Sequence, residues 1–336
     1  MLQTSGACRT LDAHHRAGSI TMQLKGIHHL TAVTADAPGN YAFYTQTLGL
    51  RLVKKTVNQD QTEAYHLFYA DGVGSPGTDI TFFDFPVPPE RRGSQSISRT
   101  GFRVAGEASL PWWQHRFETL GVTHGPIHVR DGRLTMDFED PEGQRLSLVD
   151  AGERNGGHPW EQSPVPVEHQ MLGLGPITIS IRQWEPTDAV LTHILGMEQV
   201  RSYTHDGTQT LVYSMGDGGA GAELHVALEP GMSPAQAGAG GVHHVAFCVA
   251  DDDYDAWAEH LPAARLPSSG PVDRYYFRSL YFREPNGILM ELATEGPGFA
   301  ADEPLESLGQ SLALPPFLEP QREAIERRLK PLETGS

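Results

Sequence analysis

Two doubled histidines, at the starts of two similar segments, are the residues best suited to chemistry in this chain. The segments are Gly26–Thr31, which reads GIHHLT, and Gly241–Ala246, which reads GVHHVA. A single carboxylate, Glu291, stands among apolar neighbours in the run 288–292. Two imidazoles and one carboxylate on one face of a divalent metal leave coordination positions open, and this is the arrangement typical of non-haem iron(II) oxygenases. The residue types therefore indicate a metal site with room for small ligands.

The alternation of side chains along a β-strand indicates how these residues could converge. His243 shares a face with large apolar residues, whereas His244 shares the other face with the small residue Ala246, which leaves room beside it. Glu291 projects away from its apolar neighbours in the same manner. A buried carboxylate without a partner is costly, and a cation would stabilise it. We therefore predict that His29, His244 and Glu291 together bind one metal ion.

Four similar units along the chain would position these residues. The sequence has strand-like segments followed by helix-like stretches, with a spacing of roughly 70 residues. The strand-like segments are Ile27–Val33, Thr100–Val104, Ile177–Ile181 and Val242–Val249, and the helix-like stretches are Tyr41–Leu48, Trp112–Leu120, Asp188–Leu195 and Tyr254–Leu261. About three more strands follow each helix. The sequence thus predicts an α+β fold of four βαβββ modules arranged as two domains.

A stretch rich in Gly and Pro after Asp150 separates the second unit from the third and indicates a domain boundary. We expect a disordered N-terminal extension over 1–22, an N-terminal domain of two modules over 23–152 and a linker over 153–172. A C-terminal domain of two modules over 173–298 should follow, and then a tail over 299–336 with one short helix. We interpret the tail as a strap over the body of the protein.

The composition excludes several classes of protein. The chain has 336 residues, a formal net charge of -17 and two cysteines. An acidic chain without a basic cluster is repelled by nucleic acid and by anionic membranes, so neither is expected as a partner. Few cysteines, and no apolar run of membrane-spanning length, favour the cytoplasm. Isolated histidines are interpreted as ordinary core or surface residues; they are His66, His128, His158, His169 and His225.

At these residues the sequence resembles the vicinal-oxygen-chelate superfamily of glyoxalases, bleomycin-resistance proteins and extradiol dioxygenases, and within it the hydroquinone ring-cleaving dioxygenases. The resemblance covers about residues 24–333 and is carried by four stretches. They are Gly26–Thr31, Tyr65–Asp71 with the glycines at 74 and 77, Ser163–His169, and Leu314–Glu319. It implies the four-module fold that the repeats already predict.

The resemblance also implies site residues and a cofactor. His29, His244 and Glu291 would bind Fe(II), with Mn(II) as a possible substitute, and the substrates would be a small phenolic aromatic and O2. Further active-site positions implied by the family are His28, Thr31, His243, Arg274 and Tyr281. Tyr281 would hydrogen-bond the substrate, His243 would shuttle a proton, and Arg274 would orient a distal ring oxygen.

Two other functions remain open from the sequence. One is a glyoxalase-like lyase or isomerase that uses zinc, nickel or manganese, for which Asp79 or Asp84 would have to supply a second acidic ligand. The other is a resistance protein that binds an aromatic drug without chemistry. A homo-oligomer is compatible with the sequence, and the ring substituents of the substrate are not determined by it.

Overall fold

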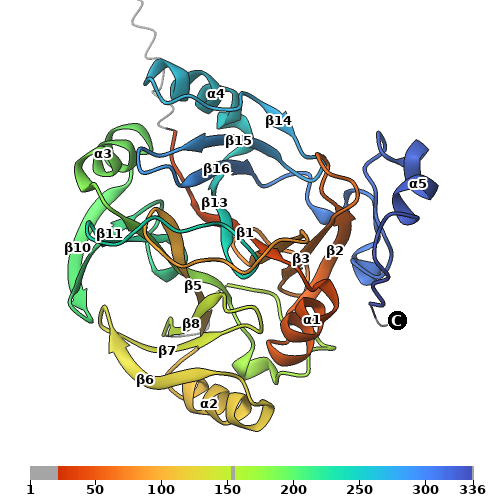
Figure 1. Ribbon diagram of the computed structural model, residues 1–336, viewed down its shortest axis with the longest axis horizontal. Helices are drawn as coiled ribbons and strands as arrows, with labels where there is room; N and C mark the ends of the chain where they lie inside the picture. Colours follow the sequence, from red (N-terminus) through yellow and green to blue (C-terminus); the bar gives the residue numbers. More distant parts are fainter. Residues whose placement is uncertain (1–21, 153–155, 335–336) are drawn as a thin grey trace, which may run out of the picture.

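The computed structural model describes residues 22–152 and 156–334, and it contains the four modules in chain order (Figure 1). Each module is a strand, a helix and three further strands, as the repeats predict. The first comprises β1 (Gly26–Thr34), α1 (Ala37–Ala42), β2 (Arg51–Val57), β3 (Tyr65–Ala70) and β4 (Asp79–Asp84). The second comprises β5 (Ser96–Val104), α2 (Ser109–Leu120), β6 (His124–Arg130), β7 (Arg133–Glu139) and β8 (Arg145–Asp150).

The second half of the chain repeats this order. The third module comprises β9 (Gly173–Ile181), α3 (Trp184–Ala189), β10 (Glu198–His205), β11 (Thr208–Ser214) and β12 (Glu223–Leu228). The fourth comprises β13 (Val242–Val249), α4 (Tyr254–Ala263), β14 (Val272–Asp273), β15 (Arg278–Arg283) and β16 (Leu289–Thr294). The predicted α+β fold of four βαβββ modules is therefore confirmed.

The strands in the described residues form two curved eight-stranded sheets, and each sheet takes one module from each half of the chain. Sheet 1 has the order β14-β15-β16-β13-β1-β4-β3-β2, and sheet 2 has the order β10-β11-β12-β9-β5-β8-β7-β6. The antiparallel pair β1 and β13 joins the modules of sheet 1, and β5 and β9 join those of sheet 2. The sheets thus group the first module with the fourth, whereas the domain limits predicted from the sequence group modules that are adjacent in the chain. Those limits stay a prediction.

The helices of the first and third modules begin earlier than their apolar pattern predicts. Asp36 caps α1 by accepting a hydrogen bond from the backbone N–H of Gly39, and Pro38 lies in its first turn. Proline is favoured there because its missing N–H would have no partner in any case. Both helices then end in a π-helical turn, at 43–47 and 190–194. The first turns carry little apolar signal, which is why the pattern misses them.

The C-terminal segment lies along the outside of sheet 1 (Figure 1). Its short helix α5 (Arg322–Glu326) buries Ile325 against Leu314, Leu318 and Val57 of β2. A helix was expected in this part of the tail, and the structure contains one. Of the expected N-terminal extension over 1–22, all but Met22 lies outside the described residues. None of the described helices combines the length and the apolarity that crossing a bilayer requires.

Candidate metal centre and adjoining cavity

Three central strands of sheet 1 bring the predicted metal ligands together. β16 pairs with β13 so that Glu291 stands beside Ala246, and β1 pairs with the other edge of β13 so that His29 also stands beside Ala246. Tyr281 on β15 flanks Glu291 in the same row. His244 precedes Ala246 by two residues and therefore points to the same face. The small side chain of Ala246 leaves the space in which the three larger side chains meet.

The distances between the three side chains fit a single ion. Nε2 of His29 lies 3.2 Å from Oε2 of Glu291, and Nε2 of His244 lies 2.8 Å from the same oxygen. One ligand atom from each residue lies within 4.8 Å of the others. Metal–nitrogen and metal–oxygen bonds of about 2.0–2.2 Å would place an ion between atoms at this separation. The three residues predicted from the sequence are therefore adjacent, on strands far apart in the chain.

A β-bulge places the first histidine of each pair beside the second. Where β1 and β13 pair, the register shifts once at His28 and once at His243, so that each is an extra residue in its strand. Strict alternation would send neighbouring side chains to opposite faces. Here Nδ1 of His28 lies 2.9 Å from Nδ1 of His29, and Nδ1 of His243 lies 2.7 Å from Nδ1 of His244. The first histidines thus contact the predicted ligands from behind.

The hydrogen bonds of His28 determine which nitrogen of His29 is free. Nε2 of His28 lies 3.0 Å from the backbone oxygen of Thr294, which can only accept, so this nitrogen carries the proton. Burial, with His29 beside it, lowers the pKa of His28 to about 3, so the ring is neutral and its Nδ1 is an acceptor. His29 must then donate from Nδ1, so Nε2, which faces Glu291, is the nitrogen that could bind a metal. This is the orientation of a metal-binding histidine.

The charges at the centre favour a cation. Burial raises the pKa of Glu291, but the nearby rings of His29 and His244 outweigh it and hold this pKa well below its usual value. Burial lowers the pKa of His244. Despite their short contacts, both oxygens of Glu291 and Nε2 of His244 lack a hydrogen bond of acceptable geometry among the described residues, although all are buried. Such orphaned atoms are expensive, and a divalent metal would satisfy all three. The residues present therefore fit a metal ion.

A cavity adjoins this centre, and three of the predicted active-site residues other than the metal ligands line it. Thr31, Arg274 and Tyr281 line it together with His29 and His244. Nε of Arg274 donates to the hydroxyl oxygen of Tyr281 at 3.2 Å. Burial and the nearby Glu291 carboxylate raise the pKa of Tyr281, so its hydroxyl stays protonated. His28 and His243 are not among the lining residues, and His243 is exposed at the start of β13.

The cavity also has a histidine that sequence reasoning dismissed. His66 on β3 lines it, and Nε2 of His66 lies 2.9 Å from the hydroxyl of Thr81. Thr81 in turn donates to Thr31 at 2.9 Å. A single histidine has no recognisable sequence pattern. Only the pairing of β3 with β4 and of β4 with β1 reveals this series of hydrogen bonds from His66 through Thr81 to Thr31. Further lining residues that sequence reasoning missed include Gln59, Asp60, Phe83, Tyr276 and Phe277.

Replacing His28 by phenylalanine should weaken metal binding by about 10- to 100-fold, because His29 loses the acceptor that orients its ring. The matched variant His243→Phe should have a smaller effect, since His243 is exposed and water can replace it as the partner of His244. Competition titration with a chromophoric chelator measures both dissociation constants. Equal losses in the two variants would contradict this ordering.

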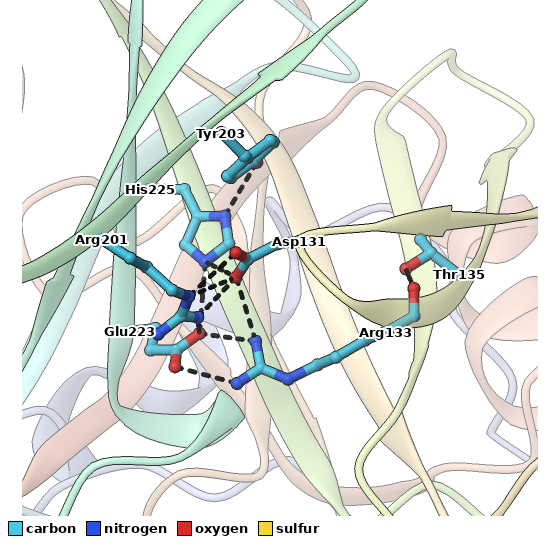
Figure 2. Close-up of polar contacts among 7 residues, drawn as sticks. All are labelled: Asp131, Arg133, Thr135, Arg201, Tyr203, Glu223 and His225. Atoms are coloured by element: carbon cyan, nitrogen blue, oxygen red, sulfur yellow. Dashed lines mark hydrogen bonds and ion pairs between the residues drawn. The ribbon is translucent and has the colours of Figure 1, made fainter.

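Sheet 2 has its own cluster of polar residues, but there the carboxylates are already neutralised (Figure 2). Arg133 forms a bidentate pair with Glu223, at 2.7 and 2.9 Å, and Arg201 pairs with Asp131. His225 lies 3.3 Å from Glu223. Burial raises the pKa of Glu223, but His225 and the two guanidinium groups outweigh it and lower this pKa strongly. No net negative charge remains there to attract a cation, so the metal site is expected in sheet 1.

The fold and this arrangement define a paired-module protein with one candidate metal centre on sheet 1. The sequence matches the Glyoxalase/Bleomycin resistance protein/Dioxygenase superfamily over residues 26–148 and 174–292, and the chain belongs to that superfamily. The matched ranges together include all four modules.

Individual relatives cover almost the whole chain. The chain is 48% identical to the "Putative ring-cleaving dioxygenase MhqA" of Bacillus subtilis over 93% of its own length and 100% of that protein. It is 32% identical to the chlorohydroquinone/hydroquinone 1,2-dioxygenase of Sphingobium indicum, over 91% of its length and 96% of that protein. A crystal structure from Bacillus subtilis, described as a "putative dioxygenase", superposes with a TM-score of 0.86 at 34% identity and covers 93% of this chain and 99% of that one.

Proposed function

We propose that this protein is a cytoplasmic, Fe(II)-dependent dioxygenase that cleaves the ring of hydroquinone-type aromatics. The observation that carries the proposal is the buried set of two imidazoles and one unpartnered carboxylate beside a cavity with aromatic walls. Three protein ligands leave coordination positions open, as oxygen chemistry requires. The names of two relatives, a ring-cleaving dioxygenase and a hydroquinone 1,2-dioxygenase, support the same reaction.

His29, His244 and Glu291 would hold the metal, which would supply Lewis acidity and open coordination positions. Tyr281 would act as a hydrogen-bond donor toward the substrate, because Arg274 donates to its oxygen and leaves the hydroxyl hydrogen free to point into the cavity. Thr31 would act likewise, since its oxygen already accepts from Thr81. These groups would orient the phenol that reacts.

The two histidines behind the ligands would have different roles. His28 is buried and bonded at both nitrogens, so it would keep His29 oriented rather than exchange protons. His243 is exposed, and its ring lies 5.5 Å from that of Phe83 in the cavity wall, so it would take a substrate proton to solvent directly rather than through His244, whose Nε2 would bind the metal. Arg274 would orient the distal oxygen of the ring, as its place in the cavity wall allows.

Metal analysis of protein purified without oxygen, followed by oxygen uptake with hydroquinone, tests the proposal. We expect about one iron per chain and consumption of O2 together with the appearance of an absorbing ring-opened product. Treatment with a chelator should abolish uptake, and Fe(II) should restore it better than Mn(II). Metal-loaded protein that consumes no O2 with any hydroquinone would overturn the proposal.

The two alternatives from the sequence have less support. A glyoxalase-like lyase would need a second acidic ligand, but neither Asp79 nor Asp84 belongs to the ligand group on sheet 1. Burial raises the pKa of Asp79 well above its usual value, and Asp84 lies 3.4 Å from Nζ of Lys330. A protein that only sequesters aromatics would need no ligand set, and it would bind them equally well after metal removal.

A further inference from the structure

The loop after β14 contacts the loop after β2 across the open side of sheet 1. Arg274 directly follows β14, one edge of the sheet, and Gln59 and Asp60 follow β2, the other edge. Nη1 of Arg274 lies 3.1 Å from Oδ2 of Asp60, and Nε2 of Gln59 donates to the backbone oxygen of Arg274 at 2.8 Å. The loop after β2 lies beside the end of β14 in Figure 1. All three residues line the cavity.

Arg274 is the only lysine or arginine among the described residues that line this cavity. Its Nε donates a hydrogen bond to the hydroxyl of Tyr281, and its Nη1 forms an ion pair with the carboxylate of Asp60. An arginine with a free edge binds a carboxylate strongly, through two parallel hydrogen bonds. Here Asp60 contacts Nη1 of Arg274 through one oxygen, so it occupies part of that edge and compensates the positive charge in the cavity wall.

The ion pair has little value for the stability of the fold. The side chain of Asp60 is 73% exposed, and pairs at such exposed positions contribute about 0–1 kcal/mol. Its place at the cavity therefore calls for another reason. A substrate ring that fills the cavity would meet Asp60 and Arg274, because they line it together with His29 and His244. There a neutral hydroxyl can donate to Asp60 and accept from Arg274, whereas a carboxylate would meet a like charge.

We propose that Asp60 is a specificity-determining residue, which restricts the substrates to rings without an anionic substituent. This inference rests on the proposed function, because it assumes that a metal-bound phenolic ring fills the cavity. It predicts that the parent protein prefers hydroquinone to 2,5-dihydroxybenzoate, which has the same two hydroxyls and one added carboxylate. Without Asp60, Arg274 would be free to bind that carboxylate.

The test compares Asp60→Asn with a control, Asp255→Asn, in iron-loaded protein. Asp255 also forms an exposed pair with an arginine of sheet 1, Arg278, at 3.6 Å, but it does not line the cavity. Calorimetric titration under nitrogen gives the dissociation constants of hydroquinone and 2,5-dihydroxybenzoate, and oxygen uptake is measured separately. In Asp60→Asn the affinity for 2,5-dihydroxybenzoate relative to hydroquinone should rise by about tenfold, the effect of one nearby charge. In Asp255→Asn the ratio should stay within about twofold.

The outcomes separate the two proposals. An unchanged ratio in Asp60→Asn, with normal oxygen uptake from hydroquinone, overturns the role of Asp60 and leaves the dioxygenase standing. The expected change in ratio without any oxygen uptake overturns the dioxygenase but supports charge selection by Asp60. Failure of the iron-loaded parent protein to bind either ring overturns both.

Discussion

Replacing Glu291 by glutamine should abolish tight metal binding and ring cleavage together, with turnover falling by at least about 10³-fold. Glutamine has nearly the same shape but no charge, so it removes the anionic ligand and leaves the cavity in place. Metal content after dialysis and oxygen uptake with hydroquinone measure the two effects. A variant that keeps stoichiometric metal and activity would remove Glu291 from the site.

Without metal, the stability of Glu291→Gln should not fall below that of the parent protein. Without an ion, both oxygens of the buried Glu291 carboxylate lack a hydrogen-bond partner among the described residues, which is unfavourable. Glu291→Gln should therefore be at least as stable as the parent protein in a chelator, and metal should raise the melting temperature of the parent alone.

Glu223→Gln is the matched control, because Glu223 is an equally buried carboxylate on sheet 2 that already has cationic partners. Its replacement leaves Arg133 without its bidentate acceptor, so it should lower stability with or without metal. The metal content should be unchanged. Loss of metal in this control, or destabilisation of metal-free Glu291→Gln to the same extent, would show that the Glu291 result reflects folding rather than ligation.

Replacing Lys54 by methionine should lower the free energy of unfolding by about 3 kcal/mol. The side chain of Lys54 is fully buried in β2, and its Nζ contacts Asp302, at 2.7 Å, and Glu303 of the C-terminal segment. It also lies 4.7 Å from the ring centre of Tyr276, whose hydroxyl donates to Asp302 at 2.8 Å. Removal of the ammonium group leaves two poorly solvated carboxylates facing each other. Urea denaturation measures the loss.

The control for this prediction is Lys25→Met. Lys25 also pairs with a glutamate, Glu295 at 3.2 Å, but both side chains are nearly half exposed, so the change should be within about 0.5 kcal/mol. Because Tyr276 lines the cavity, Lys54→Met should also raise the KM for hydroquinone. Equal stability losses in the two variants would mean that the buried network does not hold the C-terminal segment in place.

The sequence predicts the modules well because each one repeats the same apolar pattern, and four weak signals support one another. It also predicts which three side chains meet, since only two of the four modules carry doubled histidines. Of the four closing strands, only β16 has an acidic residue in its interior, with apolar residues on both sides; in the others the acids stand at the strand ends. The bulges at His28 and His243 could not be predicted, because they depend on how β1 and β13 pair. The positions of His66 and Asp60 in the cavity wall could not be predicted for the same reason, as their partners come from other strands and loops.

The sequence pattern also could not predict which modules share a sheet. All four modules present a similar first strand, and local patterns do not state which of these strands pair. The predicted ligand set contained the missing information: His29 and His244 can share an ion only if the first and last modules are neighbours. A shared metal ligand set specifies contacts between residues far apart in the chain, whereas apolar periodicity describes only neighbouring residues.

The pairing of β1 with β13 has a consequence for the order of events during synthesis. More than 200 residues separate these strands in the chain, so β1 leaves the ribosome long before its neighbour exists. Until then its exposed edge can pair with other chains, a hazard that makes chaperone binding to the nascent N-terminal half advantageous. The candidate metal centre cannot have all three of its ligands before Glu291 has emerged, so it can be completed only after translation is nearly finished.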